Sequence, residues 1–396
     1  MQKCLACGSK IQDILFRIPN LPLVDSFSKS IAEARQVPSY TIELGQCVDC
    51  STIQLVSPPD TSLIYKNYIY ESSSSPDLDR HFEEYADSVS KLDLKKSSNI
   101  LEIGANDGLL LKKIKKRGYN NLVAVDPAPQ VHAIEDDDIL VINDFFNRHV
   151  SEKLLDDKGC FDLIVANNCF SHIPNLSDVL NQCRHLLSKT GSILIEVQST
   201  ADLLEKVVFD YIYHEHYFYH TLTSFSKLAD MANLQVYNVT KFPTKGGSFR
   251  FFLGHKGKHK QDKSVDYFKF RESILNIHER IPWERLDLYL ERLKVSLKEY
   301  LDGVENIFGY GASATGTVLT HFMGLESKIK YVIDDNKKRQ GTFSPSTCVP
   351  VYGRDRINSA DVCIILAWRH AKLIEPFLNE KNIKYIVPLP FLKTND

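Results

Sequence analysis

The stretch NILEIGANDGLLLKKIKKRG, residues 99–118, predicts a buried strand, a glycine turn and an amphipathic helix in direct succession. Glycine allows a sharp turn in which the backbone approaches a ligand closely, and the N-terminus of the following helix is electropositive. A dinucleotide fingerprint would have its second glycine where Asn106 stands, and this side chain would crowd a pyrophosphate. The turn, with Gly104 and Gly108, therefore favours a ligand without phosphates.

Acidic residues beside this turn indicate which ligand it binds. Glu102, just before the turn, suits a cationic or amine-bearing group. Asp126 ends the next expected strand, where it can accept hydrogen bonds from two ribose hydroxyls, and Asp144 ends the third, near an adenine amino group. These features describe S-adenosylmethionine (SAM), a sulfonium attached to adenosine; the alternative is a turn that serves packing alone. The expected cofactor-binding residues are Glu102, Gly104, Asn106, Gly108, Asp126, Asp144 and Asn168.

The segments after this turn repeat the alternation of strand and helix. Further strands are expected at 121–129, 139–146, 161–173 and 191–198, with a helix at 176–189. Such alternation implies a parallel sheet with helices on both faces. Residues 234–243 and 246–257 form an expected antiparallel pair. We therefore expect residues 71–258 to be a class I SAM-methyltransferase domain with a Rossmann-like α/β fold.

A second, smaller Rossmann-like α/β domain is expected at 259–396. A charged linker (258–264) precedes a helical region, 266–302, which we expect Pro282 to interrupt. A second glycine turn, GYGASATG at 309–316, then fits the G-x-G-x-x-A form, with Asp334 at the end of the following strand. Three interpretations of this turn stay open: a nicotinamide dinucleotide site, a contact to the diphosphate or nucleotide of another ligand, or a structural turn.

Four of the nine cysteines form two C-x-x-C pairs near the N-terminus, Cys4 with Cys7 and Cys47 with Cys50. Two such knuckles can place four thiolates tetrahedrally around zinc, and an all-cysteine set is typical of a closed structural site. A redox pair and unliganded thiols are the alternatives. We expect residues 1–70 to form a zinc-binding module, and Cys4, Cys7, Cys47 and Cys50 to be the ligands.

Composition limits the partners of the chain. Its 396 residues are enough for two or three domains, and a net charge of −2 gives no general attraction to nucleic acid or to anionic membranes. No apolar run reaches the roughly 18 residues of a membrane span, and the N-terminus lacks a signal-peptide core. We expect a cytoplasmic protein without nucleic-acid or membrane partners. The oligomeric state is open, and a monomer is plausible.

Residues 209–220, FDYIYHEHYFYH, concentrate histidines and aromatic residues. His214 and His216 are two apart and would share one face of a strand. No glutamate follows His216 to complete the helical zinc-hydrolase motif with His220. A histidine among aromatic residues is usually hydrogen-bonded core or surface, so the meaning of this segment depends on its surroundings.

With these motifs in this order, the chain resembles the three-domain SAM-dependent sugar-nucleotide C-methyltransferases, which have an N-terminal zinc-binding domain. The resemblance covers nearly the whole sequence. It rests on the paired C-x-x-C knuckles, EIGANDG, NNCFSHIPNL, YHEH, GGSFR, GYGASATG and IDDN. It implies methylation, at C3, of a 4-keto-deoxyhexose carried by a nucleoside diphosphate, most often dTDP, and a C-terminal domain that closes the sugar-nucleotide cleft.

The resemblance also implies roles for the histidine-rich segment. His216 would be the base that removes the acidic hydrogen beside the C4 carbonyl. Tyr213 and His172 would donate hydrogen bonds, and Glu215 would orient or polarise a partner. Tyr70 would reach in from the zinc module, with Tyr68 as a close rival. The expected catalytic residues are His216, Tyr213, Glu215, His172 and Tyr70.

One departure and two other functions keep the assignment open. Lys245 stands where relatives often have histidine, which leaves the identity of the sugar open. The alternatives are an O- or N-methyltransferase of a small metabolite or sugar and a non-catalytic SAM-binding protein. The intact YHEH segment would be unexplained in a non-catalytic protein.

Overall fold

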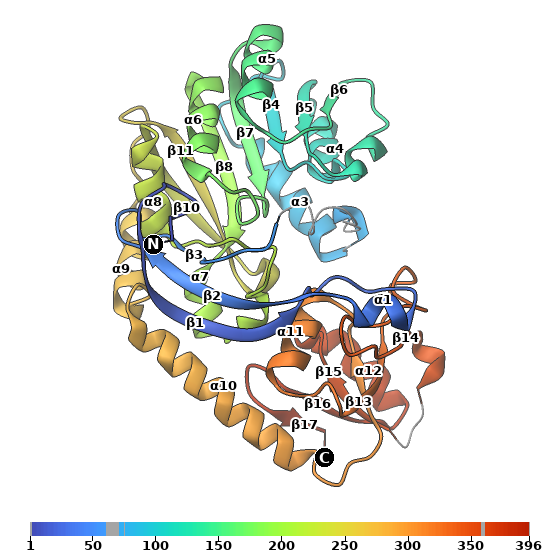
Figure 1. The fold of residues 1–396 in the computed structure, drawn as a ribbon. Coiled ribbons are helices and arrows are strands. Elements are labelled where there is room, and N and C mark those ends of the chain that lie inside the picture. The colour runs from blue at the N-terminus through green and yellow to red at the C-terminus, as the bar shows by residue number, and fades with distance from the viewer. Residues whose placement is uncertain (1, 61–70, 75, 358–360, 396) are drawn as a thin grey trace.

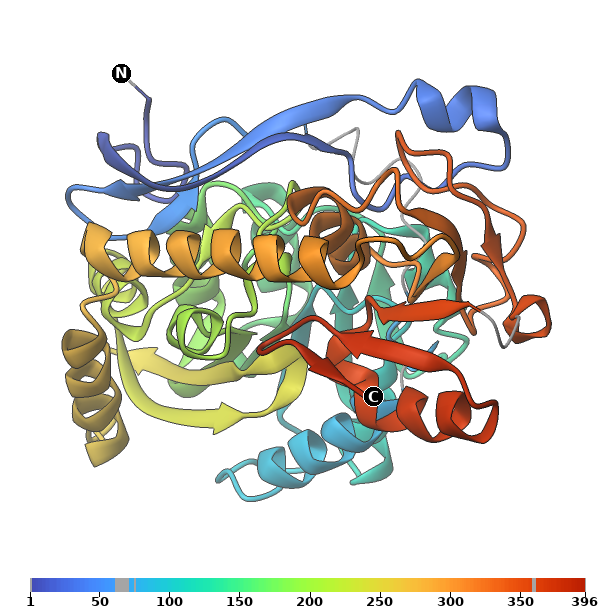
Figure 2. The ribbon, with the colours of Figure 1, turned by 90° about the horizontal axis from the view of Figure 1, so that it is seen from below.

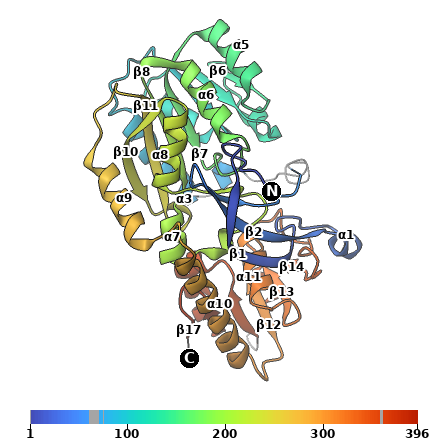
Figure 3. The ribbon, with the colours of Figure 1, turned by 60° about the vertical axis from the view of Figure 1, so that its left-hand side comes forward.

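The computed structural model describes residues 2–60, 71–74, 76–357 and 361–395, in which three β-sheets occur. The N-terminal sheet is antiparallel, in the order β1-β2-β3-β9. Its strands are β1 (Ile11–Pro22), β2 (Ser39–Cys47), β3 (Ile53–Leu55) and β9 (Phe218–Tyr219), and α1 (Ile31–Arg35) lies between β1 and β2. The long β1–β2 hairpin runs along one side of the molecule, across the junction of the central and the C-terminal parts (Figures 1, 2 and 3).

The central sheet has seven strands in the order β10-β11-β8-β7-β4-β5-β6. Strands β4 to β8 are parallel, whereas β10 and β11 run antiparallel, as the sequence predicts. The bounds are β4 (Asn99–Ile103), β5 (Asn121–Val125), β6 (Ile139–Ile142), β7 (Phe161–Asn167), β8 (Leu187–Gln198), β10 (Leu234–Phe242) and β11 (Ser248–His255). The expected class I methyltransferase arrangement is confirmed.

Helices cover both faces of the central sheet because each has an apolar stripe directed at it. Helix α3 packs beside α4, and α6 packs between α5 and α8. Their bounds are α3 (Pro76–Val89), α4 (Leu109–Lys116), α5 (Arg148–Lys158), α6 (Leu176–Leu186), α7 (Thr200–Glu205) and α8 (Leu222–Met231). The core under α3 and α4 is separate, whereas the core on the other face continues into the N-terminal sheet and the C-terminal part.

The C-terminal sheet has the order β14-β13-β12-β15-β16-β17, with β17 antiparallel. Its strands are β12 (Ile307–Tyr310), β13 (Ile329–Ile333), β14 (Val351–Tyr352), β15 (Val362–Ile365), β16 (Lys384–Val387) and β17 (Lys393–Thr394). Helices α11 (Ala314–Phe322) and α12 (Ala371–Glu380) accompany them. The expected second α/β unit is confirmed.

The prediction that Pro282 interrupts the helical region is wrong. The break lies between α9 (Lys263–Leu275) and α10 (Arg280–Tyr300), where Asn276 ends α9 in the left-handed conformation at φ 49°. Pro282 lies in the first turn of α10, where a missing N–H and a fixed φ cost the helix nothing. The linker expected at 258–264 is also too long. Asp262 is the N-cap of α9, so Lys263 and Ser264 already belong to the helix.

The three parts of the molecule are joined by long-range contacts. Helix α10 runs beside β1 (Figure 2). Ser28, which follows β1, forms an isolated antiparallel β-bridge with Phe343 of the C-terminal part. In the N-terminal sheet β3 pairs with β9, which belongs to the histidine-rich segment. No helix in the described ranges combines the length and the apolarity that a bilayer crossing needs.

Candidate active site

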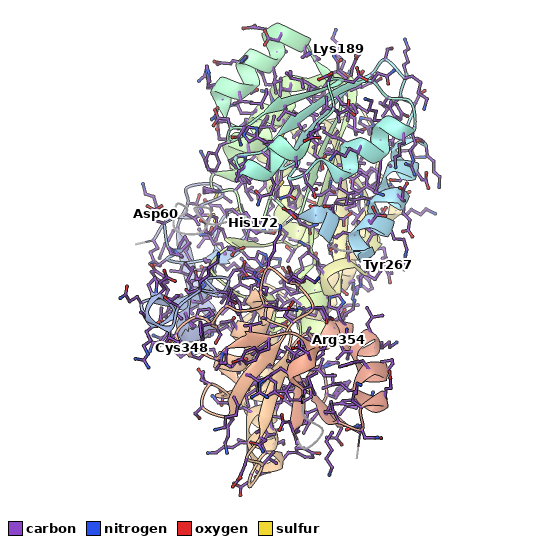
Figure 4. All side chains as sticks on the ribbon, turned by 90° about the vertical axis from the view of Figure 1, so that its right-hand side faces the viewer. Asp60, His172, Lys189, Tyr267, Cys348 and Arg354 are labelled. Carbon is purple, nitrogen blue, oxygen red and sulfur yellow. The ribbon has the colours of Figure 1, made fainter. Side chains whose placement is uncertain are left out.

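A cleft of about 1530 Å³ opens where the three parts meet. Its lining includes Asp25 from the N-terminal hairpin, His172 and His216 from the central part, and Arg339 and Arg369 from the C-terminal part. Figure 4 shows His172 at mid-height in the molecule, where the central part meets the N-terminal and C-terminal parts. The expected catalytic residues of the central part therefore gather in one cavity.

The first glycine turn forms one wall of this cleft. Gly104 and Gly108 have left-handed φ values of 73° and 71°, and a Cβ on Gly104 would lie 2.6 Å from Cβ of Cys169. Asn106 has φ 50°, and its backbone N–H donates to Oδ2 of Asp126 at 2.8 Å. Gly104, Asn106 and Asp126 line the cleft, whereas Gly108 caps α4 and packs on Ile134. On the side of the turn that faces the cleft, a ligand would therefore meet mainly backbone and small side chains.

Two buried acidic residues lie beside this turn, Asp126 in the lining of the cleft and Glu102 behind it. Glu102 is buried, and burial raises the pKa of its carboxyl well above the usual value, against a hydrogen bond from Asn167. Its Oε2 has no hydrogen-bond partner among the described residues. An orphaned buried oxygen next to the turn fits a cationic or amine-bearing ligand. Burial also raises the pKa of Asp126, against hydrogen bonds from the backbone of Ala128 and Asn106.

The other two expected cofactor residues lie at different places. Asn168 lines the cleft with φ 55°, and its N–H donates to the carbonyl of Glu196 at 2.7 Å. Asp144 is exposed and is not part of the lining, where Phe145 and Asn147 stand instead. The exposed ring of Phe145 was missed, although an aromatic residue after a strand end is a recognisable stacking surface for a base.

His216 is buried and held in one tautomer. Its Nδ1 lies 2.8 Å from the carbonyl oxygen of Tyr211. A carbonyl only accepts, so Nδ1 carries the proton and Nε2 holds the lone pair. Burial lowers the pKa of His216 to about 3, opposed by the Tyr211 carbonyl and assisted by the charge of Lys245. The imidazole is therefore neutral near pH 7 and can accept a proton at Nε2.

Two further expected catalytic residues, Tyr213 and His172, contact this ring, and Glu215 lines the same cleft. The centroid of Tyr213 lies 4.2 Å from that of His216, and the centroid of His172 lies 5.0 Å away. Burial lowers the pKa of His172 well below its usual value, assisted by His216 and Lys245. Burial, assisted by Asp25, raises the pKa of Glu215 to about 8, so this carboxyl keeps its proton at neutral pH.

The neighbouring histidine, His214, has a structural place. It is fully buried, and its ring contacts Tyr40 of β2 edge-on, with centroids 5.6 Å apart. Tyr213, Glu215 and His216 line the cleft, whereas His214 faces the N-terminal sheet. The expectation that His214 and His216 share one face of a strand is therefore wrong, because this part of the segment forms a turn. Tyr70 and Tyr68 lie outside the described residues, so their expected roles stay predictions.

Sequence reasoning missed the cations that the C-terminal part contributes. Nη2 of Arg339 lies 2.6 Å from Oδ1 of Asp25, and Arg339 opposes the rise in the pKa of Glu215. Nη1 of Arg369 lies 2.7 Å from Oδ2 of Asp210, and its guanidinium lies over the ring of Tyr211. The run Lys337–Lys338–Arg339 directly after IDDN was an available signal, since basic residues after a strand end can face a ligand.

The four N-terminal cysteines converge as the sequence predicts. Their sulfur atoms all lie within 4.8 Å of one another. Sγ of Cys4 is 3.7 Å from that of Cys50, and Sγ of Cys7 is 3.5 Å from that of Cys47. A tetrahedral zinc site with Zn–S distances of about 2.3 Å requires sulfur atoms about 3.8 Å apart. The donor set and its spacing therefore fit zinc.

Comparisons with known proteins indicate the class of this protein. Residues 78–239 match the methyltransferase domain family, and residues 243–390 match the family described as the C-methyltransferase C-terminal domain. C-methyltransferase NovU of Streptomyces niveus is 26% identical over 405 residues, which cover 98% of this chain and 96% of NovU. The ubiquinone biosynthesis O-methyltransferase of Xylella fastidiosa is 24% identical over 115 residues, covering 28% of this chain and 45% of that enzyme.

Among solved structures, the PH0226 protein of Pyrococcus horikoshii OT3 is similar with a TM-score of 0.39 and 14% identity, covering 49% of this chain and 99% of that one. The fold and the two family matches define a methyltransferase. More closely, the chain belongs to the SAM-dependent C-methyltransferases, since the C-terminal family match and the full-length similarity to NovU both point to methyl transfer onto carbon.

Proposed function

We propose that this enzyme methylates C3 of a 4-keto-deoxyhexose carried on a nucleoside diphosphate. The observation that carries the proposal is the tautomer of His216, whose Nε2 lone pair is set by the hydrogen bond of Nδ1 with Tyr211. The cleft also receives groups from the C-terminal part, as a two-part substrate with a sugar and a nucleotide requires. The resemblance of the ordered motifs supplies the substrate class.

The chemistry follows from the groups around His216. The C4 carbonyl acidifies the C3 hydrogen, and Nε2 of His216 accepts this proton as a general base. Hydrogen-bond donors aimed at the developing enolate oxygen lower the barrier. Tyr213 and His172, whose rings lie beside that of His216, and the protonated Glu215 of the same cleft would be these donors. SAM supplies an electrophilic methyl group, which the enolate carbon takes up. The walls of the cleft align the two reactants.

The residues of the first glycine turn would hold SAM. Glu102 offers an unpartnered buried oxygen to a cationic ligand, and Asp126 offers its carboxylate at the lining. Asn168 and Phe145 complete this end of the cleft. Asp144 would need to turn inward to read the adenine, so its expected role depends on a movement of the loop.

The second glycine turn fits the wall of a sugar-nucleotide cleft. Ser313 Oγ accepts from the N–H of Gly316, and Asp334 accepts from the N–H groups of Ala312 and Asn336. The polar side chains at this turn therefore stabilise the backbone of the turn and of the loop after β13. Lys337 and Arg339 line the cleft beside it and are suited to a diphosphate.

The cysteine cluster would hold a structural zinc ion. All four positions are occupied by thiols, so no coordination position is left open for a reacting water. The cytoplasmic location expected from the sequence is a reducing compartment, which suits such a site. Both the location and the monomeric state stay predictions.

The test is hydrogen exchange at C3. The enzyme is incubated in D2O with dTDP- and GDP-linked 4-keto-deoxyhexoses and S-adenosylhomocysteine (SAH), and deuterium at C3 is followed by NMR. The wild type is expected to exchange C3–H, whereas His216→Asn is expected to lose exchange and methylation by about 10²–10⁴-fold with SAH binding retained. With SAM, a methyl group on oxygen or nitrogen of the product would refute carbon methylation and favour the O- or N-methyltransferase alternative.

A further inference from the structure

A strained turn directs a lysine into the cleft. Lys245 lies in the 3-10 turn Thr244–Gly246 between β10 and β11, and its backbone has φ 51° and ψ 34°. This left-handed conformation is unfavourable for a residue other than glycine. Strain of this kind persists where the surroundings determine the backbone, and it gathers at functional sites. Lys245 lines the cleft together with His172 and His216.

The neighbours of the turn hold it in place. Gln198 donates to the carbonyl of Lys245 at 3.2 Å, and Lys206 donates to the carbonyl of Gly246 at 2.8 Å. Gly247 has φ 145°, and a Cβ there would lie 2.5 Å from Cγ of Asp202. Because both sides of the turn are fixed, the direction in which the lysine leaves the backbone is fixed too.

The charge of Lys245 acts on the reacting groups. Lys206 and Lys241, near the same turn, both pair with Asp202, at 2.9 Å and 2.8 Å. The ammonium of Lys245 lowers the pKa of both His172 and His216 and opposes the rise in that of Glu215. Burial lowers the pKa of Lys245 itself, against the charges of Glu196 and Glu215. These effects agree with the geometry, since Lys245 lies in the lining of the same cleft as the proposed base.

We propose that Lys245 is a further catalytic residue, whose ammonium stabilises the enolate oxygen formed when His216 deprotonates the ketosugar. The inference rests on the proposed function. In this step the C3–H bond breaks, its proton goes to Nε2 of His216, and its electron pair moves through the new C3–C4 double bond onto the carbonyl oxygen. Lys245 donates a hydrogen bond to this oxygen and keeps its protons. A preorganised cation in a water-poor cleft needs little reorganisation as that charge develops.

The test compares three variants by C3–H exchange in D2O with SAH, by methyl transfer with SAM and by SAH binding. Lys245→Met removes the charge at similar length, and Lys245→Arg retains it. Lys241→Met is the matched control, since Lys241 lies on the same hairpin and pairs with Asp202. Lys245→Met is expected to slow both reactions by about 10²–10³-fold in kcat, as for loss of one oxyanion donor. Lys245→Arg and Lys241→Met are expected to stay within about tenfold of the wild type, and SAH affinity should be unchanged in all three.

Several outcomes would overturn the inference. If Lys245→Met raises KM for the sugar nucleotide and leaves kcat unchanged, the lysine binds substrate, for example its phosphates, and does not act on the enolate. If SAH affinity falls by the same factor as kcat, the turn is merely structural. Loss of activity in Lys245→Arg as severe as in Lys245→Met would also contradict a charge effect. Absence of exchange in the wild type would instead overturn the proposed function itself, and the role of Lys245 with it.

Discussion

The N–H of Asn175 donates a hydrogen bond to the carbonyl oxygen of Leu5, with an N···O distance of 2.8 Å. Leu5 lies between Cys4 and Cys7 in the first cysteine knuckle, and Asn175 is the N-cap residue of α6, three residues after His172. The next knuckle residue, Ala6, accepts in the same way from Ser177 at 3.0 Å. The knuckle therefore supports the loop that carries His172.

Loss of the proposed zinc ion should disturb this loop. Cys7→Ser, or removal of metal by a chelator, is expected to lower kcat at least tenfold and to speed amide exchange in residues 170–177, because the knuckle backbone would no longer be held. The SAM turn at 104–108 should keep its protection. Metal content, kcat and hydrogen-exchange mass spectrometry check this, with the exposed Cys160→Ser as a matched thiol control. Full activity in metal-free enzyme would contradict the coupling.

Gly104 is expected to tolerate no side chain. Gly104→Ala adds a Cβ 2.6 Å from Cβ of Cys169, at a φ of 73° that disfavours alanine. The combined clash and strain should lower SAH affinity more than tenfold and reduce stability by about 2–4 kcal/mol. Gly118→Ala is the control, since its φ of 89° imposes similar strain but its Cβ would meet only Lys96 at 3.6 Å. Calorimetry and chemical denaturation measure both; equal effects in the two variants would argue against a role of Gly104 at the cofactor wall.

Arg369 should matter for both stability and turnover. Asp210 is fully buried and accepts from Arg369 at 2.7 Å and from Nε1 of Trp368 at 2.9 Å. Because Arg369→Met leaves a buried carboxylate without its cation, it should cost about 3–5 kcal/mol in denaturant unfolding. By contrast, Arg148→Ala removes an exposed, solvent-screened pair with Glu152 and should leave the unfolding transition nearly unchanged.

The effect of Arg369→Met on catalysis can be separated from its effect on stability. Asp210 immediately precedes Tyr211, whose carbonyl sets the tautomer of His216. Without denaturant, at a temperature where the variant is folded, its kcat should fall while its KM for SAM stays unchanged. An unchanged kcat would show that the contact joins the central and C-terminal parts without positioning the base.

Local patterns in the sequence predict the central sheet and the first glycine turn, because each strand and its turn are encoded within about 20 residues. The pairing of β3 with β9 is different. It joins Gln54 to Phe218, and a strand as short as β9 has no alternation of apolar and polar residues by which it could be recognised. For this reason the histidine-rich segment could be identified by motif order, whereas its attachment to the N-terminal sheet could not.

The pairing of acidic and basic side chains from the N-terminal and C-terminal parts was equally impossible to predict from the sequence. Asp25 and Arg339 are far apart in the sequence, and only the folded chain places their side chains 2.6 Å apart. Composition treats both as ordinary surface residues. The break at Asn276 was missed for a simpler reason: Pro282 is a conspicuous helix breaker, but its effect depends on its position within the turn. A left-handed asparagine gives a weaker signal in the sequence.

The pH dependence of C3–H exchange tests the state of His216. A base acts when it is unprotonated, that is, above its pKa, and burial lowers the pKa of His216 to about 3. The rate of exchange with SAH bound should therefore stay level as pH falls from about 7 to about 5, a range in which Glu215 also keeps its proton. A base with an ordinary imidazole pKa of about 6.5 would be mostly protonated at about pH 5 and would slow exchange about 25-fold. Circular dichroism at each pH controls for unfolding, which buried neutral histidines such as His220, whose pKa burial lowers to about 4, promote in acid. An acid limb centred near pH 6.5 in folded enzyme would show that another group, or a more exposed His216, accepts the proton.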